Sequence, residues 1–278
     1  MKTRSRHLWA ATTLVVALFA LAGCQSGGKP GAKATAGPSC GLVVLFDVSG
    51  STSARAIRER YYNDLHDSIL FTTNSGGATV PALAGGEVIM GDVITENTLA
   101  TASFPISQSF PVYDAWRTNP LQHTQAIKRA TDLVCAKARH LVLNSRPSPR
   151  TDLMNAFQLA DKVFNGSRCG KARDKILVVF SDMIEQSPSY DFTGERLTER
   201  RAEDIIQQER SAGRLPRLQG VKVWVAGATA SAGEGLNAQK IHDIQAFWIR
   251  YFRACGADLT GDRYAATLIN FELPSRRE

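Results

Sequence analysis

The fold of this chain is decided by one short stretch, Gly41-Leu42-Val43-Val44-Leu45-Phe46-Asp47-Val48-Ser49-Gly50-Ser51. Its first six residues are apolar or glycine, a pattern typical of a strand buried on both faces of a parallel sheet. A polar Asp-x-Ser-x-Ser turn begins at Asp47, and an amphipathic stretch then covers residues 54–70. The stretch therefore predicts a strand, a tight turn and a helix, a unit typical of α/β proteins.

The rest of the chain alternates short apolar runs with longer helical patterns. Strands are predicted at residues 88–95, 103–110, 175–180, 221–226 and 266–271. Helices are predicted at residues 124–143, 152–164, 198–212 and 238–255. This alternation predicts an α/β fold, with a doubly wound, mainly parallel sheet and helices on both faces.

Length and charge narrow the class of protein. The chain has 278 residues, of which 44% are hydrophobic and 21% are charged. The length and the hydrophobic content are enough for one large buried core. The charged fraction is too low for a disordered polyelectrolyte. The net charge is +7, but no run of basic residues with interleaved aromatics occurs, so we do not expect a nucleic-acid partner.

The start of the chain has the pattern of an export signal. Three basic residues precede an apolar stretch at residues 8–22, which is too short for a comfortable membrane span. The stretch ends in Leu21-Ala22-Gly23-Cys24, which resembles the lipobox of bacterial lipoproteins. The resemblance implies cleavage before Cys24, lipidation of its sulfur and, because Gln25 follows, the outer membrane facing the periplasm if the cell is Gram-negative. A plain secretory peptide or an uncleaved anchor is the alternative.

Residues 24–39 are predicted to form a flexible tether. From residue 25 onward they comprise only Gln, Ser, Gly, Lys, Pro, Ala and Thr, a composition that cannot bury enough apolar surface to fold. Such a chain reaches about 20 Å on average, enough to hold a domain near a bilayer. The predicted organisation is a signal peptide at 1–23, a tether at 24–39 and one folded domain at 40–278.

Three motifs lie at predicted element boundaries, where ligands bind in open α/β sheets. The turn at residues 47–51 follows the first strand, Arg150-Thr151-Asp152-Leu153 opens a helix, and Phe180-Ser181-Asp182 ends a strand. Together they resemble the von Willebrand factor type A (vWA) domain with its metal-ion-dependent adhesion site, over residues 40–271. The resemblance implies a Rossmann-like vWA fold and five metal ligands: Asp47, Ser49, Ser51, Thr151 and Asp182.

Hydroxyl and carboxylate oxygens are the ligands that Mg²⁺ and Mn²⁺ prefer in proteins. With only two carboxylates committed, the ion keeps an open position for an outside anionic oxygen. The resemblance thus implies a membrane-anchored binding module, not an enzyme, whose Mg²⁺ (or Mn²⁺) binds an acidic group on a partner protein or polymer. The alternative is a structural or envelope-assembly lipoprotein in which the metal only stabilises the fold.

Enzymatic functions find less support in the sequence. The histidines are isolated, and no His-x-x-x-His or Cys-x-x-Cys spacing indicates a zinc site. A metal-dependent phosphatase with Asp47 as nucleophile is a distant alternative. Such enzymes carry Asp-x-Asp after the first strand, whereas here Ser49 stands in the third position and lacks the acid function.

Several polar residues also have purely structural interpretations. Ser and Thr after strands are common helix caps, and Asp182 could cap a loop. Asp152 is predicted to interact with the helix dipole rather than to bind the metal. Glu185 and Asp191 are predicted to be solvated loop acids. Gly50 is expected to let the backbone bend close to the ion.

Four cysteines follow Cys24, in a chain that we expect to be exported to a compartment where thiols can oxidise. If the strand order of the vWA family holds, Cys40 and Cys169 precede neighbouring parallel strands, which implies a disulfide between them. Cys135 and Cys255 form a second, weaker candidate pair. Buried free thiols are the alternative.

The end of the chain departs from the vWA family. That family usually adds a helix after the last strand, but here only residues 272–278 follow, and Pro274 disfavours a helix. We therefore expect the C-terminal helix to be missing, and with it a helix-driven affinity switch.

Overall fold

A six-stranded sheet forms the centre of the residues that the structure describes. The structure is a computed structural model that describes residues 38–194, 196–228 and 236–274; the predicted signal peptide and nearly all of the predicted tether lie outside them. The strands are β1 (Cys40–Asp47), β4 (Glu87–Ile94), β5 (Ile106–Ser109), β6 (Asp174–Phe180), β7 (Val221–Ala226) and β8 (Tyr264–Ala265). Their order is β5-β4-β1-β6-β7-β8, and within this sheet β5 alone runs antiparallel.

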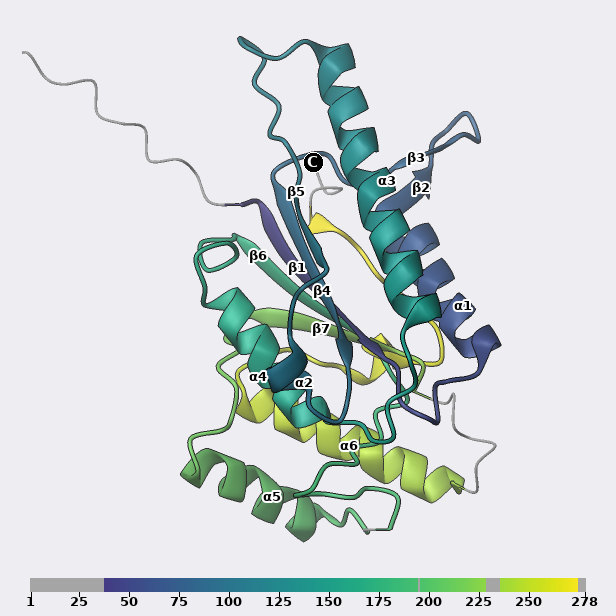
Figure 1. The fold of residues 1–278 in the computed structure, drawn as a ribbon. Helices are drawn as coiled ribbons and strands as arrows, with labels where there is room; N and C mark the ends of the chain where they lie inside the picture. The colour runs from purple at the N-terminus through teal and green to yellow at the C-terminus, as the bar shows by residue number, and fades with distance from the viewer. Residues whose placement is uncertain (1–37, 195, 229–235, 275–278) are drawn as a thin grey trace, which may run out of the picture. The chain divides into compact units, whose positions relative to one another are not determined.

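The strand order places β1 in the middle of the sheet (Figure 1). From β1 the chain crosses to β4 on one side and later to β6 and β7 on the other, which is the arrangement of a doubly wound fold. Every residue of β1 is buried, as the unbroken apolar run predicts. Phe46 lies in register with Phe180 of β6, and the two rings stack with their centroids 5.1 Å apart. The predicted α/β class with a mainly parallel sheet is confirmed.

Helices cover both faces of this sheet (Figure 1). The helices are α1 (Arg55–Asp64), α2 (Thr98–Thr101), α3 (Pro120–Asn144), α4 (Leu153–Phe164), α5 (Glu199–Ser211) and α6 (Ala238–Ala254). Apolar residues of α1 and α3 pack on one face, and those of α4, α5 and α6 pack on the other. Among the described residues, no helix has the length and apolar character to cross a membrane.

The longer helices begin where the sequence supplies a capping side chain. Asn119, Asp152, Thr198 and Asn237 each accept a hydrogen bond from a first-turn amide, at the starts of α3, α4, α5 and α6. Such caps satisfy backbone amides that have no partner within the helix. Local chemistry therefore explains why the helical patterns of the sequence begin near these positions.

The insertion between α1 and β4 contains a short hairpin of its own. A π-helical turn, Leu65–Leu70, leads from α1 into β2 (Phe71–Thr73), which pairs antiparallel with β3 (Thr79–Pro81). In the turn between these strands, the Asn74 side chain accepts hydrogen bonds from two backbone amides. The sequence pattern does not predict this hairpin.

The last predicted strand, residues 266–271, is wrong. The structure has only the two-residue strand β8, and the chain beyond it is irregular up to Pro274. Asn270 has a φ of 52°, outside the extended region that a strand requires. Leu268 and Leu273 are buried in the core of the α1 and α3 face, so the apolar residues pack without forming a strand. No α-helix follows β8 within the described residues.

Neither predicted disulfide is formed in the structure, where Cys40, Cys135, Cys169 and Cys255 are free thiols. Cys40 and Gly41 are consecutive in β1, so they face opposite sides of the sheet. Cys169 packs over Gly41, where an added Cβ would lie 3.2 Å from its Sγ. Cys135 packs on the α1 and α3 face, whereas Cys255 belongs to the core of the other face. The sheet therefore separates the members of both pairs.

Candidate metal centre

The Asp-x-Ser-x-Ser turn folds back over the end of β1. Asp47 is the last residue of the strand and is fully buried. Its Oδ1 accepts a hydrogen bond from Ser49 N at 2.8 Å, and its carbonyl oxygen accepts one from the Thr52 hydroxyl at 2.9 Å. These bonds fix the backbone that carries the hydroxyls of Ser49 and Ser51.

Two hydroxyls of this turn have the spacing of ligands on one ion. Ser49 Oγ lies 3.1 Å from Ser51 Oγ and 3.4 Å from Thr52 Oγ1. Adjacent ligands of an octahedral Mg²⁺, each about 2.1 Å from the ion, lie about 3.0 Å apart. The Ser49 and Ser51 hydroxyls therefore fit two adjacent positions of one octahedron. Ser51 is partly exposed, so the turn is accessible from solvent at this residue.

The end of β6 brings a second acidic side chain to the same edge of the sheet. The Ser181 hydroxyl donates a hydrogen bond to Asp47 Oδ2 at 2.7 Å and accepts one from Met183 N at 2.9 Å. Asp182 is buried, and its Oδ1 accepts a hydrogen bond from the amide two residues further on at 3.1 Å. Because β1 and β6 are parallel neighbours, the residues that follow them lie close together.

Thr151 lies in the loop between α3 and α4, beside the turn after β1. Ser148 N donates a hydrogen bond at 2.8 Å to the carbonyl of the residue after Asp47, which joins this loop to the turn. Thr151 is buried, and its carbonyl oxygen accepts a hydrogen bond from Gln186 N, in the loop after β6, at 2.8 Å. The loops that carry the five predicted ligands therefore meet at the carboxyl edge of the sheet.

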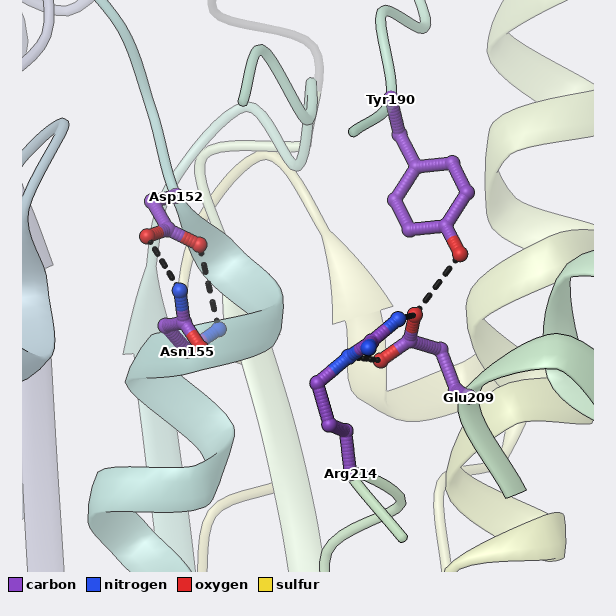
Figure 2. Close-up of polar contacts among 5 residues, drawn as sticks. All are labelled: Asp152, Asn155, Tyr190, Glu209 and Arg214. Atoms are coloured by element: carbon purple, nitrogen blue, oxygen red, sulfur yellow. Dashed lines mark hydrogen bonds and ion pairs between the residues drawn. The ribbon is translucent and has the colours of Figure 1, made fainter. Parts of the chain in front are cut away.

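Asp152 caps α4 through both of its carboxylate oxygens (Figure 2). Its Oδ1 accepts a hydrogen bond from Asn155 N at 3.2 Å, and its Oδ2 accepts one from Asn155 Nδ2 at 2.7 Å. Acids in the first turn of a helix are stabilised by the amides and by the helix dipole. The prediction that Asp152 interacts with the amino end of a helix is confirmed.

Glu185 is not the solvated loop acid that the sequence predicts. It is fully buried, and its Oε2 accepts hydrogen bonds from Leu153 N at 2.8 Å and Met154 N at 3.3 Å, the first amides of α4. Burial raises the pKa of the Glu185 carboxyl to about 8. The unpaired amides of a helix N-terminus explain why an acid is tolerated inside the protein here. Asp191 is exposed as predicted, and the Thr193 hydroxyl lowers the pKa of its carboxyl.

The loop after β6 is anchored to α5 by a buried acid (Figure 2). The Tyr190 hydroxyl donates to Glu209 Oε1 at 2.7 Å, and Arg214 donates to both oxygens of the same carboxylate, at 2.5 and 3.0 Å. Glu209 and Tyr190 are buried. Leaving a buried carboxylate without partners is unfavourable, and although the Arg214 side chain is 46% exposed, these three bonds help to hold in place the loop that begins at Asp182.

The two buried carboxylates give the site a negative character. Burial, and then the neighbouring charge of Asp182, raise the pKa of the Asp47 carboxyl well above its usual range. Arg58 is buried behind the turn, but its guanidinium donates to backbone carbonyls, those of Val48 at 3.1 Å and Ser145 at 2.6 Å. Two ionised carboxylates are favoured in such surroundings when a cation is bound beside them.

The donor set suits a hard cation. It consists of carboxylate and hydroxyl oxygens, which fit Mg²⁺ or Mn²⁺. Within the described residues, no cluster of three or more His, Cys, Asp or Glu side chains is placed to hold a metal. The fit to the metal that the motifs predict rests on the mixed set of carboxylate and hydroxyl oxygens.

Four polar residues at this edge are not predicted from the sequence: Thr52, Arg58, Ser148 and Ser181. Thr52 directly follows the predicted ligand Ser51, and Ser181 directly precedes the predicted ligand Asp182. A small hydroxyl beside a ligand position is the signal in the sequence that could have found them. Arg58 lies on an amphipathic helix, where a charged residue is expected in solvent. Its burial depends on carbonyl groups that are distant in the sequence.

Beside the candidate metal centre, Gly227 has a strict conformational role and Gly50 does not. Gly227 follows β7 with a φ of 100°, and an added Cβ would lie 2.4 Å from Tyr61 Oη and 2.9 Å from Ser181 O. A Cβ at Gly50 would lie in open space. The expectation that Gly50 is required for the backbone to approach the ion therefore has no support in the structure.

No family model matches this sequence, and no curated protein matches it. Several solved structures are similar at a low level. The pilus adhesin SpaC of Lactobacillus rhamnosus GG is 14% identical, with a TM-score of 0.40 over 83% of this chain and 28% of that chain. The manganese-loaded TRAP protein of Plasmodium vivax is 14% identical, with a TM-score of 0.35 over 75% of this chain and 63% of that chain.

The human COPII-coat protein Sec24c is 10% identical, with a TM-score of 0.31 over 79% of this chain and 33% of that chain. This chain spans less than two thirds of the length of each of these three proteins. At such TM-scores the similarity carries no argument about a site, a ligand or a partner.

Proposed function

We propose that this chain is a membrane-anchored vWA lipoprotein that binds a divalent cation and, through it, an acidic group on a partner protein or polymer at the cell envelope. The anchor is the lipidated Cys24, which holds the domain at the outer membrane, facing the periplasm, if the cell is Gram-negative. The protein performs no catalytic reaction of its own.

The turn after β1 is the observation that carries this proposal. Ser49 and Ser51 present two hydroxyls 3.1 Å apart, next to the buried carboxylates of Asp47 and Asp182. The two carboxylates supply the negative charge that retains a cation, and Thr151 offers a further oxygen from the adjoining loop. A bound Mg²⁺ or Mn²⁺ would offer a coordination position to an outside carboxylate oxygen.

A basic groove next to this turn favours an acidic partner. A cavity of about 670 Å³ lies between α1 and α3, and Ser53, two residues after Ser51, contributes to its wall. Three arginines and one histidine line the cavity: Arg55, Arg58, Arg139 and His140. None of its lining residues, all of which belong to the described chain, is acidic. Arg58 is engaged by backbone carbonyls and Arg55 pairs with Glu59 at 2.7 Å, so Arg139, together with Arg55, is the cation of this basic groove that would attract a ligand with several carboxylates.

A carboxylate polymer of known chemistry tests the proposal. The chain from Gln25 onward would be measured for binding to poly-L-glutamate in Mg²⁺ and again after addition of EDTA. We expect binding that EDTA removes and that the Asp47→Ala variant lacks. Asp191→Asn, which changes an exposed acid outside the site, should bind as wild type does.

Two outcomes would favour the alternatives. If the protein binds Mg²⁺ but binds poly-L-glutamate equally with and without it, the metal only stabilises the fold. If wild type hydrolyses a simple phosphoester and Asp47→Ala does not, the protein is a metal-dependent phosphatase.

A further inference from the structure

Four large apolar side chains are exposed within one short segment, although burial of each would be favourable. Their exposed fractions are 71% at Val112, 45% at Tyr113, 97% at Trp116 and 66% at Leu121. Residues 111–121, called the apolar loop below, lead from β5 into the first turn of α3. Single exposed apolar residues are common, but a group that includes an almost fully exposed Trp marks an interaction surface.

Hydrogen bonds shape the turn within the apolar loop. Asp114 Oδ1 accepts a hydrogen bond from Trp116 N at 3.0 Å, and the Asp114 carbonyl accepts two further amides. At the base of the loop, His123 Nε2 donates to Pro111 O at 3.0 Å. An added Cβ at Gly85 would lie 2.3 Å from the same carbonyl oxygen, so the loop packs closely on the domain. Trp116 is therefore displayed by a hydrogen-bonded turn.

The apolar loop lies where the chain enters the folded domain, at the amino end of β1. Ser39 N donates to Gly86 O at 2.9 Å, and Gly86 N donates to Phe110 O at 3.0 Å. An added Cβ at Gly86 would lie 3.2 Å from Ser39 Oγ and 3.5 Å from Val112 Cγ2. Figure 1 shows the first turns of α3 and the segment before them projecting beyond this end of the sheet.

The candidate metal centre lies at the opposite end of β1. The strand has eight residues and therefore spans about 25 Å. The apolar loop and the turn that begins at Asp47 are thus at opposite edges of the sheet. The apolar loop is therefore not part of the candidate metal centre.

We propose that the apolar loop inserts into the headgroup region of the lipid bilayer to which Cys24 is anchored. This inference rests on the lipid anchor of the proposed function. The segment from Cys24 to Pro38 extends at most about 50 Å and averages about 20 Å, so the anchor keeps the amino end of β1 near the membrane surface. Its only charged residues are Lys29 and Lys33, which favour anionic headgroups.

The chemistry of the loop fits a lipid interface. Trp and Tyr are enriched at headgroup depth, because their rings are apolar and carry one polar N–H or O–H group. Val112 and Leu121, before and after Trp116 in the sequence, add exposed apolar area, and the exposed Arg117 can contact a lipid phosphate. A projecting turn, unlike a groove, lets single side chains enter between lipids.

Insertion at this end orients the domain. The carboxyl edge of the sheet, with Asp47 and the basic groove, then points away from the membrane and towards partners in the surrounding compartment. The lipid on Cys24 and the apolar loop act as two linked contacts, which bind a membrane more firmly than either contact alone.

Tryptophan fluorescence tests the insertion. The unlipidated chain from Gln25 onward has three tryptophans, of which Trp224 and Trp248 are 4% and 0% exposed. Brominated acyl chains in vesicles of phosphatidylethanolamine and phosphatidylglycerol quench a Trp that enters the bilayer. We expect quenching of wild type that Trp116→Ala abolishes, and about tenfold weaker partitioning of Leu121→Ser, which equals about 1.4 kcal/mol.

Leu133→Ser is the matched control, because Leu133 is an exposed leucine of α3 outside the apolar loop (45% exposed) and its replacement should leave partitioning unchanged. Absence of quenching, or an equal loss in Leu133→Ser, contradicts the proposal. A lipid-free dimer that dissociates on Trp116→Ala also contradicts it, because a second copy would then cover the loop. EDTA should leave partitioning unchanged, which separates insertion of the loop from metal binding. Palmitate labelling tests lipidation of Cys24 by itself, so failure of the lipid anchor is distinguishable from failure of insertion.

Discussion

Replacing Glu185 by Gln should change how the stability of the protein depends on pH. Glu185 is buried, and burial raises the pKa of its carboxyl from 4.5 to about 8. Between these two values the folded state holds a proton that the unfolded state has lost. The free energy of unfolding therefore falls as the pH rises through this window. Below this pH window the carboxyl is protonated in both the folded and the unfolded state, so it does not lower the free energy of unfolding.

One proton taken up on folding corresponds to a slope of at most about 1.4 kcal/mol per pH unit. The Glu185→Gln variant keeps an oxygen that can accept from Leu153 N and Met154 N, as Oε2 of Glu185 does, but it cannot ionise. The variant should match wild type near pH 5 and become the more stable protein towards pH 8. Its stability should depend less steeply on pH, by up to the slope given above.

Urea denaturation in EDTA, at steps from about pH 5 to about pH 8, measures this difference without a metal contribution. Asp191→Asn is the control in the same loop. The pKa of Asp191 is lowered, so the stability that this carboxylate contributes is lost only as the pH falls below this range. Replacing Asp191 should therefore not change how steeply the free energy of unfolding depends on pH. Parallel curves for wild type and Glu185→Gln would refute the reasoning.

Cys24→Ser should leave the protein out of the lipid-anchored fraction, because anchoring depends on the acylated sulfur; palmitate labelling equal to that of wild type would contradict this. Arg55→Glu combined with Arg139→Glu should weaken metal-dependent binding to poly-L-glutamate about tenfold, and an equal effect of Arg200→Glu on α5 would argue against the basic groove. Phe157→Ala should lower the free energy of unfolding by about 3–5 kcal/mol, because the buried ring packs against aromatic residues of α6. A loss below about 1 kcal/mol in urea denaturation would show that this core is not tightly packed.

The central strands could be predicted because burial on both faces leaves an unbroken apolar run in the sequence. The segment at residues 266–271 shows where this signal fails. It is as apolar as a strand, but Asn270 turns the chain and Leu268 is buried in a core formed by α1 and α3. Contacts with distant helices, which a local pattern does not contain, decide its conformation.

The position of the candidate ligands at one edge could be predicted because each lies beside a strand end or a helix start, and a parallel sheet brings such positions together. The burial of Glu185 and Arg58 could not be predicted, because it depends on backbone groups of distant segments, such as Leu153 N and Ser145 O. The side of the sheet that Cys40 faces depends on the strand's register, which its spacing from Cys169 in the sequence does not reveal.

The central claim is a divalent-cation site at the turn after β1, and calorimetric titration of the metal-free chain with Mg²⁺ and Mn²⁺ tests it most directly. We predict one bound ion per chain and a matching rise in stability, about 2.7 kcal/mol at a metal concentration of 100 times Kd. Asp47→Ala should bind no ion, whereas Asp152→Asn, which changes the cap next to Thr151, should bind it as wild type does. Absence of binding to wild type, or equal binding to Asp47→Ala, would contradict the account.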